Sequence, residues 1–318
     1  MIIGIVVVHI PPDIPVHSNN LLYMFDIFLT DGVFRAAVPL LTMLSGYLMI
    51  TSRLDQNYIL LLSKKTRSLF IPLVLWNLPL VLFLYFLQKY QLLMHPFSEN
   101  MYPFNIKVWL DGVLGLTSAP VNYPLNFIRD LFAIFLLSPA FGWLLRHIPY
   151  QGLAIILVIY FLDLDGLFVL RESMLISFYL GGLGAIKKWN LTSLDRYAVI
   201  LALIFFSTAF GIAYLGIEKI DWFRVIAPFC VWPAISLFVD RSVGNFLYRN
   251  SQHSFFIFLS SGPILFFFWV VYQKFGSQLP YSVFWISAPF IIVALTILMS
   301  RFFRRFFPAT ASFVLGGR

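Results

Sequence analysis

Arginine and aspartate stand side by side in a stretch that otherwise has the composition of a membrane helix. The stretch is YPLNFIRDLFAIFLLSPAFGWLLR at residues 123–146, and it predicts one long apolar helix with Arg129 and Asp130 near its start. Ionisable residues inside a membrane are costly and mark candidate functional sites. Neighbouring residues of a helix point about 100° apart, so we expect Asp130 to face another helix or a wet cavity rather than Arg129. The alternatives are structural pairing of Asp130 and an Arg129 side chain that reaches the headgroups.

His9 is the only one of five histidines that falls within the apolar run of a predicted span. An imidazole is the best general base available near neutral pH, although a packed or interfacial histidine fits the same pattern. Arg35 opens the second span, in GVFRAAVPLLTMLSGYLM, where it either anchors the interface or pairs with Asp130 or a substrate. Ser45 and Gly46 in the same span are small residues that favour close helix packing.

A basic cluster of Lys64, Lys65 and Arg67 comes directly before the third span, in SKKTRSLFIPLVLWN. Lys64 and Arg67 are three residues apart and share a helix face. Guanidinium groups match phosphate oxygens, so one interpretation is a site for a polyphosphate ligand. The other is the ordinary excess of basic residues on the inner side of a membrane, in contact with anionic lipids.

The remaining polar residues point to structure rather than chemistry. Ser260 and Ser261 lie inside an apolar span, where packing or a hydrogen bond to the preceding turn is the default role. The single cysteine, Cys230, excludes an internal disulfide. No metal site is expected, because the histidines form neither i,i+4 pairs nor an HExxH motif. These histidines are His9, His17, His95, His147 and His253.

The composition determines the kind of element that must position these residues. The 318 residues are 60% hydrophobic and only 11% charged, with a mean hydropathy of +0.86. Soluble domains are nearer half apolar and about a quarter charged, so this chain lacks the polar residues to coat a soluble fold. We therefore predict an all-α integral membrane protein. The net charge of +8 could suggest nucleic-acid binding, but no basic tail or zinc spacing occurs, so no nucleic-acid partner is expected.

Apolar runs long enough to cross about 30 Å of hydrocarbon predict about ten transmembrane helices. The short segment 21–29 is expected to lie near the outer surface instead. The predicted spans are 1–10, 34–50, 68–88, 125–145, 152–162, 173–186, 198–216, 222–239, 254–272 and 283–300.

The distribution of basic residues predicts the orientation. With both termini in the cytoplasm, most of the 22 lysines and arginines fall in inner loops, as the positive-inside rule requires. The first span is too short, since ten residues rise only about 15 Å as a helix, and we expect the native chain to start upstream of Met1. It does not read as a signal peptide. The chain is interpreted as one transmembrane domain, 1–318, without an appended soluble domain.

Several segments, in this order, resemble the acyltransferase family 3 membrane proteins of bacteria. They are GIVVVHI, RAAVPLLTMLSGYL, KKTRSLFIPLVLWN, PLNFIRDLFAIFLLSPAF, FYLGGLGAI and SFFIFLSSGPIL, and they extend over nearly the whole chain. The resemblance implies about ten helices in the bacterial inner membrane. It also implies transfer of an acyl group, commonly acetyl from acetyl-CoA, to a hydroxyl of a cell-envelope glycan or another acceptor, with acyl-CoA as co-substrate and no permanently bound cofactor.

The resemblance also assigns roles to residues. His9 matches the histidine of the first helix that is central to transfer. Lys64 and Arg67, with Lys65 between them, match the basic group implied to hold the phosphates of coenzyme A. Polar positions on the outer side of the core are matched by Arg35, Arg129 and Asp130. Two features depart from the family: its arginine about ten residues before the histidine would precede Met1, and Ser261 stands where many relatives have histidine.

These matches lead to a mechanistic hypothesis in which His9 is the base or a transient acyl carrier. Arg35 or Arg129 would stabilise the developing negative charge, and Arg129 and Asp130 would line the outer end of a polar path. The alternatives are a transporter or flippase for an envelope polysaccharide or lipid-linked sugar, and a structural assembly factor. Aromatic residues of segment 89–123, such as Tyr102, Trp109 and Tyr123, either stack on sugars or form an interfacial belt.

Overall fold

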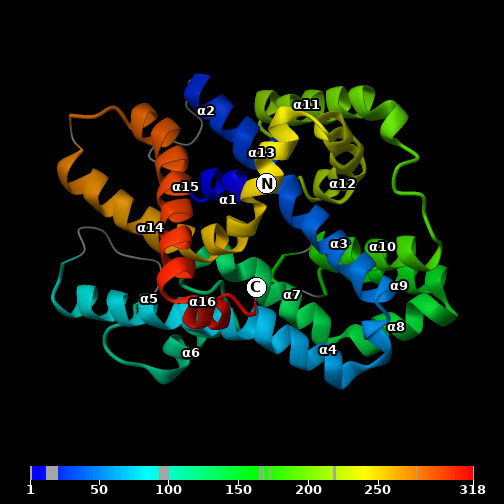
Figure 1. Ribbon diagram of the computed structural model, residues 1–318, viewed down its shortest axis with the longest axis horizontal. Helices are drawn as coiled ribbons and strands as arrows, with labels where there is room; N and C mark the ends of the chain where they lie inside the picture. Colours follow the sequence, from blue (N-terminus) through cyan, green and yellow to red (C-terminus); the bar gives the residue numbers. More distant parts are fainter. Residues whose placement is uncertain are drawn as a thin grey trace.

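The computed structural model describes residues 2–11, 21–92, 100–164, 166, 168–171, 173–217, 220–276 and 278–317. Every regular element within these residues is helical, which confirms the predicted all-α class. His17 and His95 lie outside the described residues. Figure 1 shows the helices arranged around the short helix α1 (Ile2–Val8).

Within the described ranges, six continuous helical runs are long and apolar enough to cross a membrane. A bent helix pair makes a seventh candidate span. The predicted number of ten spans is therefore not confirmed. Residues 149–161 and 173–186 form shorter apolar helices. The long runs are Leu21–Thr51, Tyr58–Lys89, Asp195–Leu215, Asp221–Phe238, Ser242–Phe275 and Tyr281–Phe306.

The first long run shows that segment 21–29 continues into the second predicted span, while its place near the outer surface stays a prediction. It continues from α2 (Leu21–Ile27) through a π turn at Phe28–Val33 and a 3₁₀ turn at Phe34–Ala36 into α3 (Ala37–Thr51). Gly32 does not end the helix, because it packs against Ala209 so closely that an added Cβ would lie 2.7 Å from the Ala209 Cβ. Tertiary packing thus outweighs the weak helix propensity of glycine.

The predicted single helix over 125–145 is also corrected, since the segment consists of two helices bent by 60°, which together remain one candidate span. These helices are α7 (Asn126–Leu136) and α8 (Ser138–His147). Pro139 explains the break, because proline lacks the N–H that an uninterrupted helix needs and its ring clashes with the preceding turn. It is accommodated in the first turn of α8 instead.

The helices α3 and α10 (Ser173–Ile186) pack closely through glycines. A Cβ at Gly46 would collide with the carbonyl oxygen of Phe178, and one at Gly181 would collide with that of Met43. The predicted role of Gly46 in close helix packing is therefore confirmed. Because lipid supplies no hydrophobic force between helices, such backbone approach is a main source of association in membranes.

The helix α1 is buried although it has only seven residues. It contacts α14 (Ser254–Phe275), α15 (Tyr281–Phe306) and the π and 3₁₀ turns before α3. Val6 and Val7 belong to a buried cluster with Ile257 and Trp285. This packing fixes the segment that carries His9 near the middle of the bundle (Figure 1).

The remaining helices surround this centre. A salt bridge of 2.7 Å from Arg146 to Asp55 ties the end of α8 to the loop after α3, so both lie at one end of the bundle. These helices are α4 (Tyr58–Lys65), α5 (Ile71–Lys89), α6 (Ile106–Leu114), α9 (Pro149–Phe161), α11 (Ala198–Leu215), α12 (Asp221–Ile235), α13 (Ser242–Asn250) and α16 (Pro308–Val314). Short turns are Leu54–Gln56, Thr66–Phe70, Tyr123–Leu125, Asp195–Tyr197, Ser236–Phe238 and Ser251–His253.

Candidate active site

A cavity of about 240 Å³ brings His9 together with three arginines from separate parts of the chain. Arg35 comes from the turn before α3, Arg171 from the loop before α10, and Arg224 from the first turns of α12. Tyr123 and Asn126, at the start of α7, complete its polar lining. The remaining lining residues are Ile5, Val8, Phe34, Val38, Pro39, Pro124, Phe127, Leu170, Ser173 and Phe258.

The position of His9 fixes the tautomer of its ring. Its Nδ1 lies 2.6 Å from the carbonyl oxygen of Ile5, and because a carbonyl only accepts, Nδ1 carries the proton. The lone pair is then on Nε2, which is buried and has no hydrogen-bond partner among the described residues. The structure therefore presents a neutral imidazole with an unused basic nitrogen, as a general base requires.

Tyr123 packs against His9, with 5.3 Å between the ring centroids in an edge-to-face arrangement. The backbone just before it is fixed from two sides. The N–H of Asn122 donates to Asn77 Oδ1 at 2.8 Å, and its side-chain amide donates to the carbonyl of Leu259 at 2.9 Å. That carbonyl lacks a helical partner because the residue four positions later is Pro263. Pro263 in α14 thus leaves the carbonyl of Leu259 free to accept the hydrogen bond from Asn122, the residue before Tyr123.

The arginines of the cavity differ in their acidic partners. Arg35 pairs with Asp31 at 2.9 Å, one helical turn earlier, so of the alternatives for Arg35 the pairing with Asp130 is not found. Arg224 pairs with Asp221 at 2.6 Å. Arg171 has no carboxylate within salt-bridge distance among the described residues, although it lies in the cavity wall. One guanidinium therefore faces the cavity without an acidic partner in the described part of the chain.

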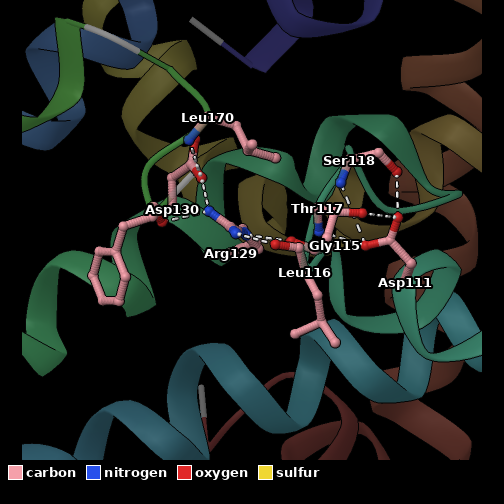
Figure 2. Close-up of polar contacts among 9 residues, drawn as sticks. Asp111, Gly115, Leu116, Thr117, Ser118, Arg129, Asp130 and Leu170 are labelled. Carbon is pink, nitrogen blue, oxygen red and sulfur yellow. Dashed lines mark hydrogen bonds and ion pairs between the residues drawn. The ribbon is translucent and has the colours of Figure 1, made fainter. Parts of the chain in front are cut away.

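Arg129 and Asp130 form an ion pair, which corrects the expectation that they point away from each other. Arg129 Nη1 lies 2.8 Å from Asp130 Oδ1, because the long arginine side chain curls back across the helix surface. Figure 2 shows the guanidinium held between Asp130 and the loop after α6. It donates to the carbonyls of Gly115 at 2.6 Å and Phe168 at 2.7 Å, and the N–H of Leu170 donates to Asp130.

Neither member of this pair lines either cavity described here. Their contacts join three segments of chain, so the structure gives them a positioning role: they hold the loop that ends at Arg171. The pair lies beside the cavity that contains His9, and the expected role of Arg129 and Asp130 at the outer end of a polar path stays a prediction.

A second cavity of about 480 Å³ adjoins the first. The two share the apolar side chains Ile5, Phe127 and Phe258 in their walls. The second cavity also contains Ser45 and Arg304, and the Arg304 Nη2 donates to the carbonyl of Gln252 at 3.1 Å. Its Nε has no partner in the described residues.

The basic cluster lies near the second cavity but not in its wall. Leu69, two residues after Arg67, is the nearest lining residue in sequence. Lys64 and Arg67 are exposed, whereas the Lys65 ammonium lies 4.0 Å above the ring of Phe135. A π turn begins at Thr66, which changes the helix register between Lys64 and Arg67. Ligand binding by these residues stays a prediction.

The two serines of α14 bond to their own helix. Ser260 donates to the carbonyl of Phe256 at 2.8 Å, and Ser261 to that of Phe258 at 3.3 Å, which confirms the structural interpretation. By contrast, sequence reasoning missed Arg171 and Arg224 as site residues. The available signal was their position beside the predicted outer ends of spans, where the positive-inside rule disfavours arginine.

Apolar helices that surround cavities lined in part by charged side chains define a multi-pass membrane protein. The sequence profile of a family described as an acyltransferase domain matches residues 1–301. The chain is also 30% identical to the succinoglycan biosynthesis protein ExoH of Rhizobium meliloti (strain 1021), over 336 residues that cover all of this chain and 90% of that protein. The chain belongs to this acyltransferase family, as its segments predicted. No solved structure matches it.

Proposed function

We propose that this protein transfers an acyl group from a coenzyme A thioester to a hydroxyl of a cell-envelope glycan, from the bacterial inner membrane. Family membership supports acyl transfer, and the relative's printed role in succinoglycan biosynthesis supports a glycan acceptor. The single observation that carries the proposal is the buried Nε2 of His9, which has a lone pair and no described partner in a cavity between helices.

The proposed reaction uses the unpartnered Nε2 of His9 as the base. His9 Nε2 accepts the proton of the acceptor hydroxyl as its oxygen attacks the thioester carbonyl carbon. The carbon–oxygen bond forms, the carbon–sulfur bond breaks, and the proton on Nε2 passes to the departing thiolate. The products are an ester and the thiol of coenzyme A. The same base would also serve a two-step route through a transient acyl group on His9.

Two neighbouring groups fit the other needs of the reaction. Negative charge develops on the carbonyl oxygen as the hydroxyl attacks, and a nearby cation lowers that barrier. Arg35 lines the cavity with His9 and suits this role, whereas Arg129 is engaged by backbone carbonyls and Asp130. Asn126, whose buried Oδ1 has no described partner, can accept a hydrogen bond from an acceptor hydroxyl.

The adjoining cavity suggests how the donor reaches His9. A coenzyme A thioester could enter at the inner face near Lys64 and Arg67, pass Arg304, and place its acyl group beyond the shared wall of Ile5, Phe127 and Phe258. Acetyl-CoA is the simplest donor for a test of this route.

The test measures transfer of radiolabelled acetyl from acetyl-CoA to envelope glycan in membranes that contain the protein. The His9→Ala change should lower transfer by about 100- to 10,000-fold, the range expected for loss of a general base. His147→Ala is a matched control, because His147 also bonds through Nδ1 to a carbonyl four residues earlier but lies exposed at the end of α8. Full activity of correctly inserted His9→Ala protein would refute the mechanism. Movement of glycan across the membrane without any donor would favour the transporter.

A further inference from the structure

We propose that a groove between α3, α10 and α12 binds an anionic phospholipid, with a hydrocarbon chain in the groove and the phosphate at Lys187 and Lys188. The groove is separate from the cavity that contains His9, since no described residue lines both. Its ligand is a lipid of the surrounding bilayer and not a substrate. The inference therefore stands apart from the proposed acyl transfer.

The shape of the groove is the first support. It has a volume of about 410 Å³ and a largely apolar wall. Where it passes α10, Gly181 and Gly184 present no side chain, which makes it deep. Asn190 and Leu194 on its rim are exposed, so the groove opens at the surface of the bundle, where it can admit a lipid chain. The other lining residues are Met43, Leu44, Tyr47, Trp189, Leu191, Ser193, Pro228, Phe229, Trp232 and Pro233.

Contacts within the protein hold the wall in place, which is the second support. The N–H of Trp189 donates to the carbonyl of Gly184 at 2.9 Å, and Trp232 Nε1 donates to the carbonyl of Leu191 at 2.9 Å. A wall that is already ordered lowers the cost of binding. Because Trp232 bonds to the loop after α10, both tryptophans lie at the loop end of the groove. Tryptophan favours the level of the lipid headgroups, so this end lies beside the phosphates.

Basic residues at the loop end of the groove are the third support. Lys187 and Lys188 come directly after α10, and Arg196 follows the rim of the groove. All three are exposed, and none forms a salt bridge with a described residue. The Lys187 ammonium lies 4.6 Å from the centroid of the Tyr150 ring, which orients it without neutralising it. With Asp195 the segment 187–196 has a net charge of +2, and basic pockets between membrane helices select anionic headgroups.

The position of the groove gives the lipid a structural effect on the candidate active site. Val38 of α3, Ser173 of α10 and Arg224 of α12 line the cavity that contains His9. The groove lies between the same three helices. A ligand that binds only when these helices are packed together stabilises the folded protein. The bound phospholipid therefore braces the helices that carry part of the site.

The experiment compares two lipids that differ in headgroup charge. The purified protein in detergent is titrated with phosphatidylglycerol and with phosphatidylcholine of the same acyl chains, and native mass spectrometry measures the Kd of each. Phosphatidylglycerol should bind about tenfold more tightly, since each basic residue near a phosphate favours anionic lipid. Glycerol 3-phosphate, which has the phosphate without the chains, should bind far more weakly. Equal affinity for the two lipids, or for glycerol 3-phosphate and phosphatidylglycerol, would overturn the proposal.

The first variant tests the basic end of the groove. The double change Lys187→Gln and Lys188→Gln should raise the Kd of phosphatidylglycerol about 10- to 30-fold and leave that of phosphatidylcholine nearly unchanged. The double change Lys107→Gln and Lys274→Gln is the matched control, because it removes the same charge from exposed lysines that do not line the groove. The same loss in both double variants would mean that total charge, and not this site, sets the affinity.

The second variant tests the groove itself. Leu44→Trp places a larger side chain in the wall and should weaken the binding of both lipids, with circular dichroism to show that the variant is folded. Leu194→Trp, on the exposed rim, replaces it if the change at the half-buried Leu44 prevents folding. Phosphatidylglycerol should also raise the unfolding temperature of the wild-type protein more than that of either variant. Undiminished binding by a folded groove variant would refute the site, whatever the result of the transfer assay.

Discussion

The rings of Tyr123 and His9 pack edge to face in the cavity wall, with 5.3 Å between their centroids at an interplanar angle of 62°. The contact joins residues that are far apart in sequence, one after α1 and one before α7. Because Nδ1 of His9 is held by Ile5 and one side of the ring by Tyr123, Nε2 has a fixed direction. The histidine is oriented by packing as well as by its hydrogen bond.

This relationship predicts that the ring of Tyr123 matters more than its hydroxyl. Tyr123→Ala should lower the rate of acyl transfer about 3- to 10-fold, since an aromatic pair contributes about 0.5–1.5 kcal/mol. Tyr123→Phe should keep most of the rate. Initial rates at saturating donor test both changes, with Tyr214→Ala, an exposed tyrosine outside the cavity, as control. A loss in Tyr123→Phe as large as that in Tyr123→Ala would show that the hydroxyl takes part directly.

A second prediction concerns the pair Arg129 and Asp130. Arg129→Gln should reduce the free energy of unfolding by about 3 kcal/mol, because it leaves the buried Asp130 carboxylate without its cation. Titration with sodium dodecyl sulfate would measure the loss. The double change Arg129→Gln with Asp130→Asn should recover part of it, since no unpaired charge is left. Equal losses in the single and double variants would argue against the pair.

The fold was predictable from the sequence where an apolar run is uninterrupted, because a chain in lipid must satisfy its backbone groups within a helix. It was not predictable at Gly32, where packing decided that the helix continues. Nor was it predictable at Pro139, because prolines such as Pro79 and Pro289 stand inside continuous helices, whereas Pro139 marks a break. The site was predictable at His9 because its residue type is rare in a span. It was not predictable at Arg171, which reaches the cavity only through the tertiary path of its loop.

A third prediction tests the packing that brings Arg35, from the turn before α3, and Ser173, from α10, to the same cavity. Gly181→Ala should cost at least about 2 kcal/mol of unfolding free energy, because its Cβ would collide with the carbonyl of Met43 and the backbone must move. Gly211→Ala is the matched control, since nothing lies within 4 Å of an added Cβ there. Equal stability of the two variants would contradict the close approach of these helices.

A fourth prediction concerns the pH dependence of the loop after α6, which supplies the carbonyl ligands of Arg129 (Figure 2). Burial alone would raise the pKa of Asp111, but hydrogen bonds from Thr117 and Ser118 hold that pKa below the ordinary value of 3.8. The carboxylate therefore adds stability above pH 3.8 that is lost as the pH falls through its lower folded-state pKa.

Thermal unfolding followed by tryptophan fluorescence checks this sign. As the pH falls from neutral to below 3.8, the unfolding temperature of the wild-type protein should decline more steeply than that of Asp111→Asn. At neutral pH the variant should be the less stable of the two. Parallel curves would mean that the bonds to Thr117 and Ser118 do not favour the charged form.

The last prediction separates two basic groups on the proposed donor route. Arg304 lines the inner cavity and its Nε has no described partner, whereas Lys64 and Arg67 are exposed outside that wall. Arg304→Gln should therefore raise the KM for acetyl-CoA about tenfold at any ionic strength, as loss of a partly buried charged contact does. The double change Lys64→Gln and Arg67→Gln should raise KM chiefly at low salt, because exposed charges act through a screened field. Titration of donor at two salt concentrations measures both. Insensitivity of KM to all three substitutions would place the donor elsewhere, since no basic residue of this face would then contact its phosphates.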